Sequence, residues 1–353
     1  MITLQPADQG GVDAAITASL ERLESRSRRL GDGPSALAAA AAAAAANGKR
    51  LRPALVVAAF RAFGGASGGT DAVWQVAAAF ELLHTGFVVH DDLIDRDDER
   101  RGHPTVAARF RARALGFGAT DEEARVVADA AAVLAGDLLL FEATRLIAAA
   151  DVTNEVRTTL FEILDRAILV SAAGELADVE NAACADVPTT DALLGAAHDK
   201  TAAYSFEAPL LAGAALAGAR PGARSELAAS AAELGLAFQL VDDLIGTFGT
   251  RRQAGRAPGA DLREAKRTPL IGLARHGGSW PEVSSALALA HTGPIAVRRA
   301  QRELEASGAR GELVTLVHDA LDRARSHAAS HELPAAVRSL LGDIGAAIEE
   351  RIP

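Results

Sequence analysis

Apolar residues along this chain recur at spacings of three and four over long segments, and short clusters rich in Gly, Pro and polar residues separate these segments. Such spacings place apolar side chains on one face of an α-helix, and Gly and Pro clusters are typical of turns. The pattern therefore predicts an all-α fold of long helices with short connections. The clusters are residues 64–70, 115–121, 186–190, 218–223, 246–260 and 276–280.

The cluster at 246–260, GTFGTRRQAGRAPGA, is much longer than the others and rich in Gly and Arg. Its length is enough for a functional loop or lid. No repeat with a fixed period appears along the chain, so a helical solenoid is not expected. No change in composition divides the 353 residues either, and one large domain spanning residues 1–353 is predicted.

Alanine dominates the composition, which favours helix, and aromatic residues are few: 11 Phe, 2 Trp and 1 Tyr. Helices lined by alanine can approach one another closely, as in a bundle. The formal charge of −10 argues against a general nucleic-acid-binding protein, which normally presents a basic face. An anionic ligand would have to be held by local Arg and Lys residues or by metal ions.

Cys184 is the only cysteine, which excludes an internal disulfide framework and fits a reducing compartment. The N-terminal stretch MITLQPADQGG lacks the basic start and apolar core of a signal peptide. The stretch AAAVLAGDLLLFEA is interrupted by Asp137, and the alanine run 38–46 is too short to cross a bilayer. We therefore expect a cytoplasmic protein with no integral membrane segment.

The stretch VVHDDLID, residues 88–95, ends an apolar run with three carboxylates. The run is apolar on nearly all faces, which predicts a buried helix. Asp91 and Asp95 stand at i and i+4, so they share one face of that helix, with Asp92 on the adjacent stripe. Because like charges at this spacing repel and ionised carboxylates in apolar surroundings are costly, a cation is expected to neutralise them.

A second stretch, QLVDDLIG at residues 239–246, repeats the pattern of an apolar pair followed by Asp, Asp, Leu and Ile. Carboxylates without Cys or His point to a hard ion, and Mg²⁺ typically takes one or two carboxylates together with water and substrate phosphates. Asp242 and Asp243 would then form the wall opposite the first motif, with a diphosphate between them. A single DDxxD motif is often only a solvated helix end, but two copies after apolar helices favour a site.

Basic residues accompany the motifs. Arg100 and Arg101 follow the first one, and GKRLRP at residues 48–53 ends in a proline suited to the first turn of a helix. The arginine side chain matches phosphate with two parallel hydrogen bonds. Without the aspartate motifs these arginines would be interpreted as ordinary solvated residues.

Together the motifs resemble the trans-isoprenyl diphosphate synthases, the polyprenyl synthetase family that includes farnesyl and geranylgeranyl diphosphate synthases. The resemblance covers roughly residues 45–275, before further helices at 280–353, and rests on seven blocks in family order. The blocks are GKRLRP, ELLHTGFVVHDDLIDRDDERRGHPT, LAGDLLLFEA, GELADVE, KTAAYSFEAPLLAGAALAG, FQLVDDLIG and DLREAKRTPL.

The resemblance implies an isoprenoid-synthase helical bundle around a central cavity and a head-to-tail prenyl transfer. An allylic diphosphate ionises, isopentenyl diphosphate attacks the allylic cation, and loss of a proton gives an allylic product longer by five carbons. This needs metal ions for the departing diphosphate, fixed cations that position the second diphosphate, and a dry apolar chamber. The family also implies three Mg²⁺ ions per site and a homodimer, which an apolar helical surface would suit.

Each role is carried over only onto matching positions. The resemblance implies Mg²⁺ ligands at Asp91, Asp95 and Asp242, supported by Asp92 and Asp243. Isopentenyl diphosphate would bind Lys49, Arg52, His84 and Arg101, and the allylic diphosphate Arg100, Lys200 and Lys266. Lys200 would also be catalytic, with Thr201 and Gln239 stabilising the cation through oxygen dipoles, and the departing diphosphate would act as the base. Taken alone, Lys200, Thr201, Lys266 and His84 would be ordinary helix or core residues.

Three positions depart from the family pattern. Gly246 replaces the third carboxylate of the second motif, Arg256 follows Gly255 where many members have Gly-Lys, and Glu175 stands where many have Gln beside Asp178. Lys and Arg differ in geometry, so the second change bears on phosphate contacts. These departures leave open a non-catalytic partner subunit of a prenyl synthase. A terpene cyclase with the same helical fold is another alternative, although it would not need GKRLRP and the paired arginines for a second diphosphate.

Product length depends on the helical turn before Asp91. The resemblance places Phe87 and Gly86 four and five residues before that aspartate, where bulk blocks elongation. Phe87 predicts a short product of 15 or 20 carbons, and Gly86 is expected to leave a gap beside it. The expectation is a 20-carbon product.

Overall fold

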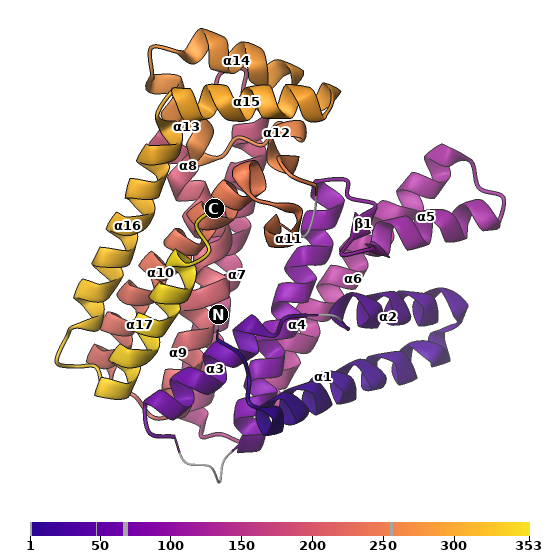
Figure 1. The fold of residues 1–353 in the computed structure, drawn as a ribbon. Helices are drawn as coiled ribbons and strands as arrows, with labels where there is room; N and C mark the ends of the chain where they lie inside the picture. The colour runs from indigo at the N-terminus through magenta and orange to yellow at the C-terminus, as the bar shows by residue number, and fades with distance from the viewer. Residues whose placement is uncertain (1, 47, 66–69, 255–256) are drawn as a thin grey trace. The chain divides into compact units, whose positions relative to one another are not determined.

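The computed structural model describes residues 2–46, 48–65, 70–254 and 257–353, and this part of the chain is almost entirely helical (Figure 1). Only two short strands occur in it, β1 (Glu99–Arg100) and β2 (His103–Pro104), paired antiparallel. The predicted all-α class is confirmed. The helices are α1 (Pro6–Ser27), α2 (Asp32–Ala45), α3 (Leu51–Ala62), α4 (Thr70–Ile94), α5 (Val106–Gly116), α6 (Asp121–Ala149), α7 (Asn154–Ala183), α8 (Thr190–Ala197), α9 (Ala208–Leu216), α10 (Pro221–Phe248), α11 (Arg251–Ala254), α12 (Ala260–Arg263), α13 (Pro269–His276), α14 (Trp280–Leu289), α15 (Pro294–Ala306), α16 (Ala309–Ala328) and α17 (Ala335–Glu349). Shorter or irregular turns are η1 (Arg28–Leu30), η3 (His198–Glu207) and η4 (Ala290–Thr292).

The predicted breaker clusters separate helices for identifiable reasons. The turn before α6 contains Gly118 at φ +89°, and Thr120 then forms a capping box with Glu123. Such a box satisfies backbone N–H groups that the first helical turn leaves unpaired. Proline in the first turn begins α10 and α13, where its missing N–H costs nothing.

The cluster at 246–260 is the exception, since α10 continues through Gly246 and Thr247 to Phe248. The predicted long loop is therefore wrong at its start, and α11 and α12 interrupt the remainder. A glycine inside a helix lowers intrinsic helix stability by only about 1 kcal/mol, which tertiary packing easily offsets. Gly255 and Arg256 lie outside the described residues.

The described chain groups into two compact units. One, here called the first unit, comprises Thr3–Glu162 with Ala212–Gly218; the second unit comprises chiefly Ile163–Leu211 and Ala219–Pro353. The single domain and central cavity expected from the sequence stay predictions.

In the first unit α4 packs against α6, α3 and α1 (Figure 1). All eight residues from Val76 to Leu83 are buried, as predicted from the apolar run. A Cβ on Gly136 of α6 would lie 2.0 Å from Nε2 of His90, so α4 and α6 approach closely. By length and composition alone, Asp71–Ile94 could span a membrane, and 67% of its most apolar window is buried in the protein, as in a core helix. The sequence pattern alone did not identify this stretch as a candidate.

In the second unit α10 packs against η3, α16 and α17. A Cβ on Gly235 of α10 would lie 2.5 Å from the Cβ of Ala202 in η3, which shows how small residues let these helices meet. The turn η3 is a π-helix of 10 residues. Extended π-helical turns are rare and frequently accompany functional sites. This one carries Lys200 and Thr201.

Candidate active site

The first aspartate motif lies at the carboxyl end of α4. The backbone N–H of Asp95 donates to the Asp91 carbonyl at 2.8 Å, so the helical spacing of these two carboxylates continues past the last residue of α4. Asp92 is buried at 6% exposure, Asp91 is half-buried and Asp95 is exposed. The buried helix thus ends in three carboxylates with different access to solvent.

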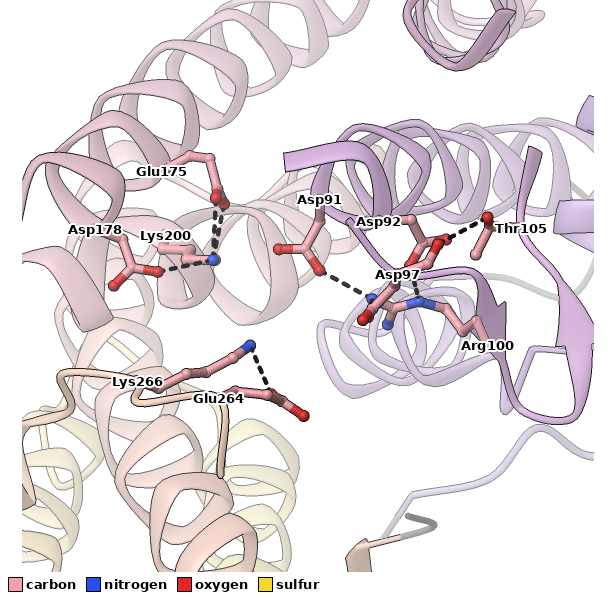
Figure 2. A network of polar contacts seen from close by, with 10 residues as sticks. All are labelled: Asp91, Asp92, Asp97, Arg100, Thr105, Glu175, Asp178, Lys200, Glu264 and Lys266. Atoms are coloured by element: carbon pink, nitrogen blue, oxygen red, sulfur yellow. Dashed lines mark hydrogen bonds and ion pairs between the residues drawn. The ribbon is translucent and has the colours of Figure 1, made fainter. Parts of the chain in front are cut away.

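A tight hairpin brings Arg100 onto this motif. Arg101 and Gly102 are the two central residues of the turn between β1 and β2, with φ of +53° and +81°. A two-residue turn whose twist matches that of the strands requires positive φ at both positions. The Arg100 guanidinium forms ion pairs with Asp92 and, at 3.0 Å, with Asp91 (Figure 2). The hydroxyl of Thr105 donates to the Asp97 carbonyl at 2.8 Å and fixes the far end of the hairpin.

The charged form of Asp92 is disfavoured in this cluster of carboxylates. Burial raises the pKa of Asp92 to about 6, with further increases from Asp91 and Asp97 and an opposing effect of Arg100. The carboxylates in turn raise the pKa of Arg100, although burial opposes this. One guanidinium therefore neutralises the motif only in part, and added positive charge would favour the ionised form of Asp92.

The predicted isopentenyl diphosphate residues come from three segments of the first unit. Lys49 is exposed just before α3, Arg52 lies in the first turn of α3, and His84 is on α4. Burial lowers the pKa of His84 well below its usual value, and the positive charges of Arg52, Arg101 and Arg100 lower it further. His84 therefore lies in the field of three arginines, two of which were predicted to bind the same diphosphate.

The neighbourhood of Phe87 differs from the expectation at one position. A Cβ on Gly86 would lie 3.1 Å from Leu140 Cδ2 and 3.2 Å from the Gly136 carbonyl oxygen of α6. The expected gap at Gly86 is therefore wrong, because α6 already fills that space. Phe87, half-buried on the adjacent stripe of α4, stays the candidate for product length.

The second motif lies within the last turns of α10. Asp243 is buried at 6% exposure and accepts a hydrogen bond from Nε2 of Gln239 at 2.9 Å. Burial raises the pKa of Asp243 well above its usual value, as do Asp261, Asp242 and Asp178, while Gln239 opposes the shift. Asp242 is half-buried and forms an ion pair with Arg351 near the C-terminus. The Arg351 guanidinium also stacks over Phe238, 4.5 Å from the ring centroid.

Asp261 is a buried carboxylate that the sequence analysis missed. A Cβ on Gly246 would lie 1.8 Å from Asp261 Oδ2, so this side chain from α12 occupies the space beside Gly246. The position where the motif lost its third carboxylate thus has another carboxylate from later in the chain. The signal was present, because Asp261 begins the block DLREAKRTPL.

Lys200 emerges from η3 between two carboxylates of α7. Its Nζ lies 3.0 Å from both Glu175 Oε2 and Asp178 Oδ2 (Figure 2). A Cβ on Gly174 would lie 2.2 Å from the Lys200 backbone nitrogen, so α7 packs directly on this turn. Thr201 follows it, half-buried, and Lys266 Nζ lies 3.8 Å from Glu264 Oε2.

The donors suit Mg²⁺ by chemistry. Within the described residues, no three His, Cys, Asp or Glu side chains gather closely enough to hold an ion alone. Magnesium does not need such a cage, because it commonly takes one or two carboxylates and completes its shell with water and substrate phosphates. Asp91 with Asp95, and Asp242 in the other unit, provide donors of that kind.

The polyprenyl synthetase family model matches residues 34–285. Geranylgeranyl diphosphate synthase of Sulfolobus acidocaldarius is 32% identical over 243 residues, 68% of this chain and 67% of that protein. The (2E,6E)-farnesyl diphosphate synthase of Mycobacterium bovis is 37% identical over 233 residues, 66% of this chain but only 58% of that protein.

A solved geranylgeranyl pyrophosphate synthase of Corynebacterium glutamicum, complexed with isoprenyl diphosphate and magnesium, superposes with a TM-score of 0.88. It is 27% identical, and the comparison covers 98% of both chains. These similarities confirm the predicted isoprenoid-synthase fold and the predicted enzyme class, a prenyltransferase that elongates prenyl diphosphates. The chain therefore belongs to the polyprenyl synthetase family.

Proposed function

We propose that this protein condenses isopentenyl diphosphate with an allylic diphosphate and releases a product longer by five carbons. The observation that carries the proposal is the end of α4, where a buried apolar helix terminates in Asp91, Asp92 and Asp95 and meets Arg100. Partly neutralised carboxylates beside an arginine suit a metal-bound diphosphate, and the apolar helix suits a hydrocarbon tail. Membership of the family supports the same reaction.

Within this proposal Asp91, Asp95 and Asp242 hold Mg²⁺, three ions per site. When bound, the metal stabilises negative charge on the departing diphosphate. Asp92 and Asp243, the buried aspartates of the two motifs, support these metal-binding carboxylates. Their raised pKa values reflect burial without sufficient positive charge.

The cationic side chains bind and orient the two diphosphates. Arg100, Lys200 and Lys266 hold the allylic diphosphate, whereas Lys49, Arg52, Arg101 and His84 hold isopentenyl diphosphate. The field of Arg52, Arg101 and Arg100 at His84 supports the second assignment, because an anion there would be strongly attracted. Thr201 and Gln239 then face the allylic cation with oxygen dipoles; the Gln239 amide nitrogen is engaged by Asp243, which leaves its oxygen for that role.

We also propose a homodimer. In the first unit α6 exposes five large apolar side chains that recur at intervals of seven or eight residues, which places them on one face. They are Val126, Val127, Val133, Leu134 and Phe141, exposed by 66, 41, 45, 51 and 57%. An exposed apolar stripe of this kind is typical of a contact with another chain, and light scattering of the purified protein would measure the mass. A cytoplasmic location stays a prediction from the single cysteine.

The experiment is an incubation with isopentenyl diphosphate and, separately, dimethylallyl, geranyl or farnesyl diphosphate, with and without Mg²⁺, analysed by mass spectrometry. We expect magnesium-dependent elongation to 15 or 20 carbons, with 20 the main product. Asp91→Asn should abolish it, while Asp98→Asn, an exposed carboxylate outside the motif, should not.

The same spectra separate the alternatives. Intact primer with well-folded protein would support a non-catalytic partner subunit, and a cyclic hydrocarbon would support a terpene cyclase. Either result would overturn the proposed condensation.

A further inference from the structure

Arg50, the first of the two arginines of GKRLRP, is not one of the predicted diphosphate ligands. It is buried at 9% exposure and has a left-handed backbone at φ +53° immediately before α3. A non-glycine residue in that region is strained, and the strain persists only where surrounding contacts hold it. The contacts of its side chain identify what holds it.

Three segments meet on the Arg50 guanidinium. Nη1 donates to Glu81 Oε1 of α4 at 2.9 Å and to the Ala45 carbonyl at 3.0 Å, and Nε donates to Asp13 Oδ1 of α1 at 3.1 Å. Glu81 is only 2% exposed. One side chain thus ties α1, the end of α2 and α4 to the start of α3.

The backbone of the segment lies directly on this ion pair. A Cβ on Gly48 would lie 2.1 Å from Glu81 Oε1 and 2.9 Å from Arg50 Nη1. Only glycine allows this approach without displacement of the carboxylate. Lys49 and Arg52 flank Arg50, and His84 lies three residues after Glu81, on the same side of α4.

We propose that Arg50 and Glu81 are positioning residues for the isopentenyl diphosphate subsite. Through Glu81 the pair fixes the segment of Lys49 and Arg52 to α4, the helix that carries His84. Side chains from two parts of the sequence can then bind one diphosphate. Neither side chain touches the substrate. This inference rests on the function proposed above.

Stability alone is a weak reason for such a pair. Burying two charges costs hydration that their attraction often fails to recover, so apolar replacement of both partners is frequently neutral. Holding charged groups in advance in the geometry that a ligand needs lowers the entropic cost of binding. The buried guanidinium of Arg50, which joins the start of α3 to α4, fits this role of holding the ligand-binding groups in place.

The test measures isopentenyl diphosphate binding by calorimetry, the KM of each substrate, and the melting temperature. We expect Arg50→Met to weaken isopentenyl diphosphate binding by on the order of tenfold or more, the effect typical of groups that orient ligands. Its KM for the allylic substrate should change little. Arg22→Met is the matched control, because Arg22 also pairs with a buried carboxylate, Glu142, from α1 to α6.

The double variant Arg50→Met/Glu81→Met separates positioning from stability. Removing both charges leaves no unpaired buried ion, so the melting temperature should recover relative to Arg50→Met while isopentenyl diphosphate binding stays weak. Recovery of both, or equal loss in the Arg22 control, would overturn the inference.

If either methionine variant fails to fold, Arg50→Lys decides. Lysine keeps the charge but cannot bridge Asp13 and Glu81 as the arginine fork does. Weaker binding of isopentenyl diphosphate alone supports the inference, and unchanged binding overturns it. A wild-type protein that neither binds isopentenyl diphosphate nor elongates any primer would instead overturn the proposed function, and this inference with it.

Discussion

His84 shows how a single half-buried side chain on a core helix reports the charge around it. Its lowered pKa means that the folded protein favours the neutral imidazole, because of burial and then of Arg52, Arg101 and Arg100. The unfolded chain titrates near the ordinary histidine value, about 6.5. The unfolded state therefore binds the extra proton first as the pH falls.

The sign of the resulting pH dependence follows directly. Stability is highest above the unfolded pKa and decreases as the pH falls below about 6.5, by at most about 1.4 kcal/mol per pH unit from this group. We predict that His84→Gln removes this part of the slope between pH 6.5 and 5, as measured by urea unfolding. His331→Gln, on an exposed side chain, is the control; an unchanged slope in His84→Gln would contradict the burial of a neutral imidazole.

Phe87 is the residue at which product length is expected to be set. Replacing it with alanine removes bulk one helical turn before Asp91, so Phe87→Ala should shift the product to more than 20 carbons in the mass spectrum. Val88→Ala, on the neighbouring stripe of the same helix, should leave the distribution unchanged. A variant that keeps the wild-type distribution would show that another side chain closes the chamber.

The contact of α10 with α12 yields a prediction about stability. A Cβ on Gly246 would lie 1.8 Å from Asp261 Oδ2, so Gly246→Ala must displace a buried carboxylate. We expect a loss of about 1 to 3 kcal/mol in the free energy of unfolding, the usual cost of overpacking. Gly342→Ala in α17 meets nothing within 4 Å and should gain up to about 1 kcal/mol by the ordinary helix preference for alanine. Equal effects of the two substitutions in urea unfolding would refute the close approach of Asp261.

The C-terminal segment meets α10 at a predicted metal ligand. Because Arg351 pairs with Asp242, its guanidinium competes with Mg²⁺ for that carboxylate. Arg351→Met should therefore lower the Mg²⁺ concentration for half-maximal activity several-fold, by analogy with charge pairs worth about 1 kcal/mol. Arg338→Met, whose side chain bonds to the Leu333 carbonyl, should not. A higher Mg²⁺ requirement in Arg351→Met would mean that Arg351 supports metal binding instead.

Sequence alone predicted the helical class, several of the breaks between helices and the family, since these depend on local periodicity and on ordered motifs. It could not show that Asp261 lies beside Gly246, because that contact depends on how α12 packs against α10. The gap expected at Gly86 was wrong for a similar reason, since only the approach of α6 fills it. The sequence analysis also missed the π-helical path of η3, a turn that packs closely against α7 and α10.

The proposed function requires joint action of two aspartate motifs, whose Asp91 and Asp242 lie 151 residues apart in the sequence and in different compact units. Each motif has an arginine partner in its own unit, Arg100 for Asp91 and Arg351 for Asp242. Their joint action on one diphosphate, predicted from the repeated pattern, can be measured without assuming any geometry. Energetic coupling between the motifs is the relevant quantity.

We predict strong coupling between Asp91→Asn and Asp242→Asn in single-turnover elongation. If both carboxylates act through the same metal-bound diphosphate, each substitution alone should slow the reaction by about a hundredfold or more, and the double variant should be little slower than the worse single one. When two residues act as one unit, the second substitution adds little to the loss of rate caused by the first. When they act independently, the losses of rate of the two single variants multiply. Asp98→Asn combined with Asp242→Asn provides the independent reference, since Asp98 lies outside the motif. Multiplied losses for Asp91 and Asp242 would mean that the two motifs serve separate steps, and the single shared site would have to be abandoned.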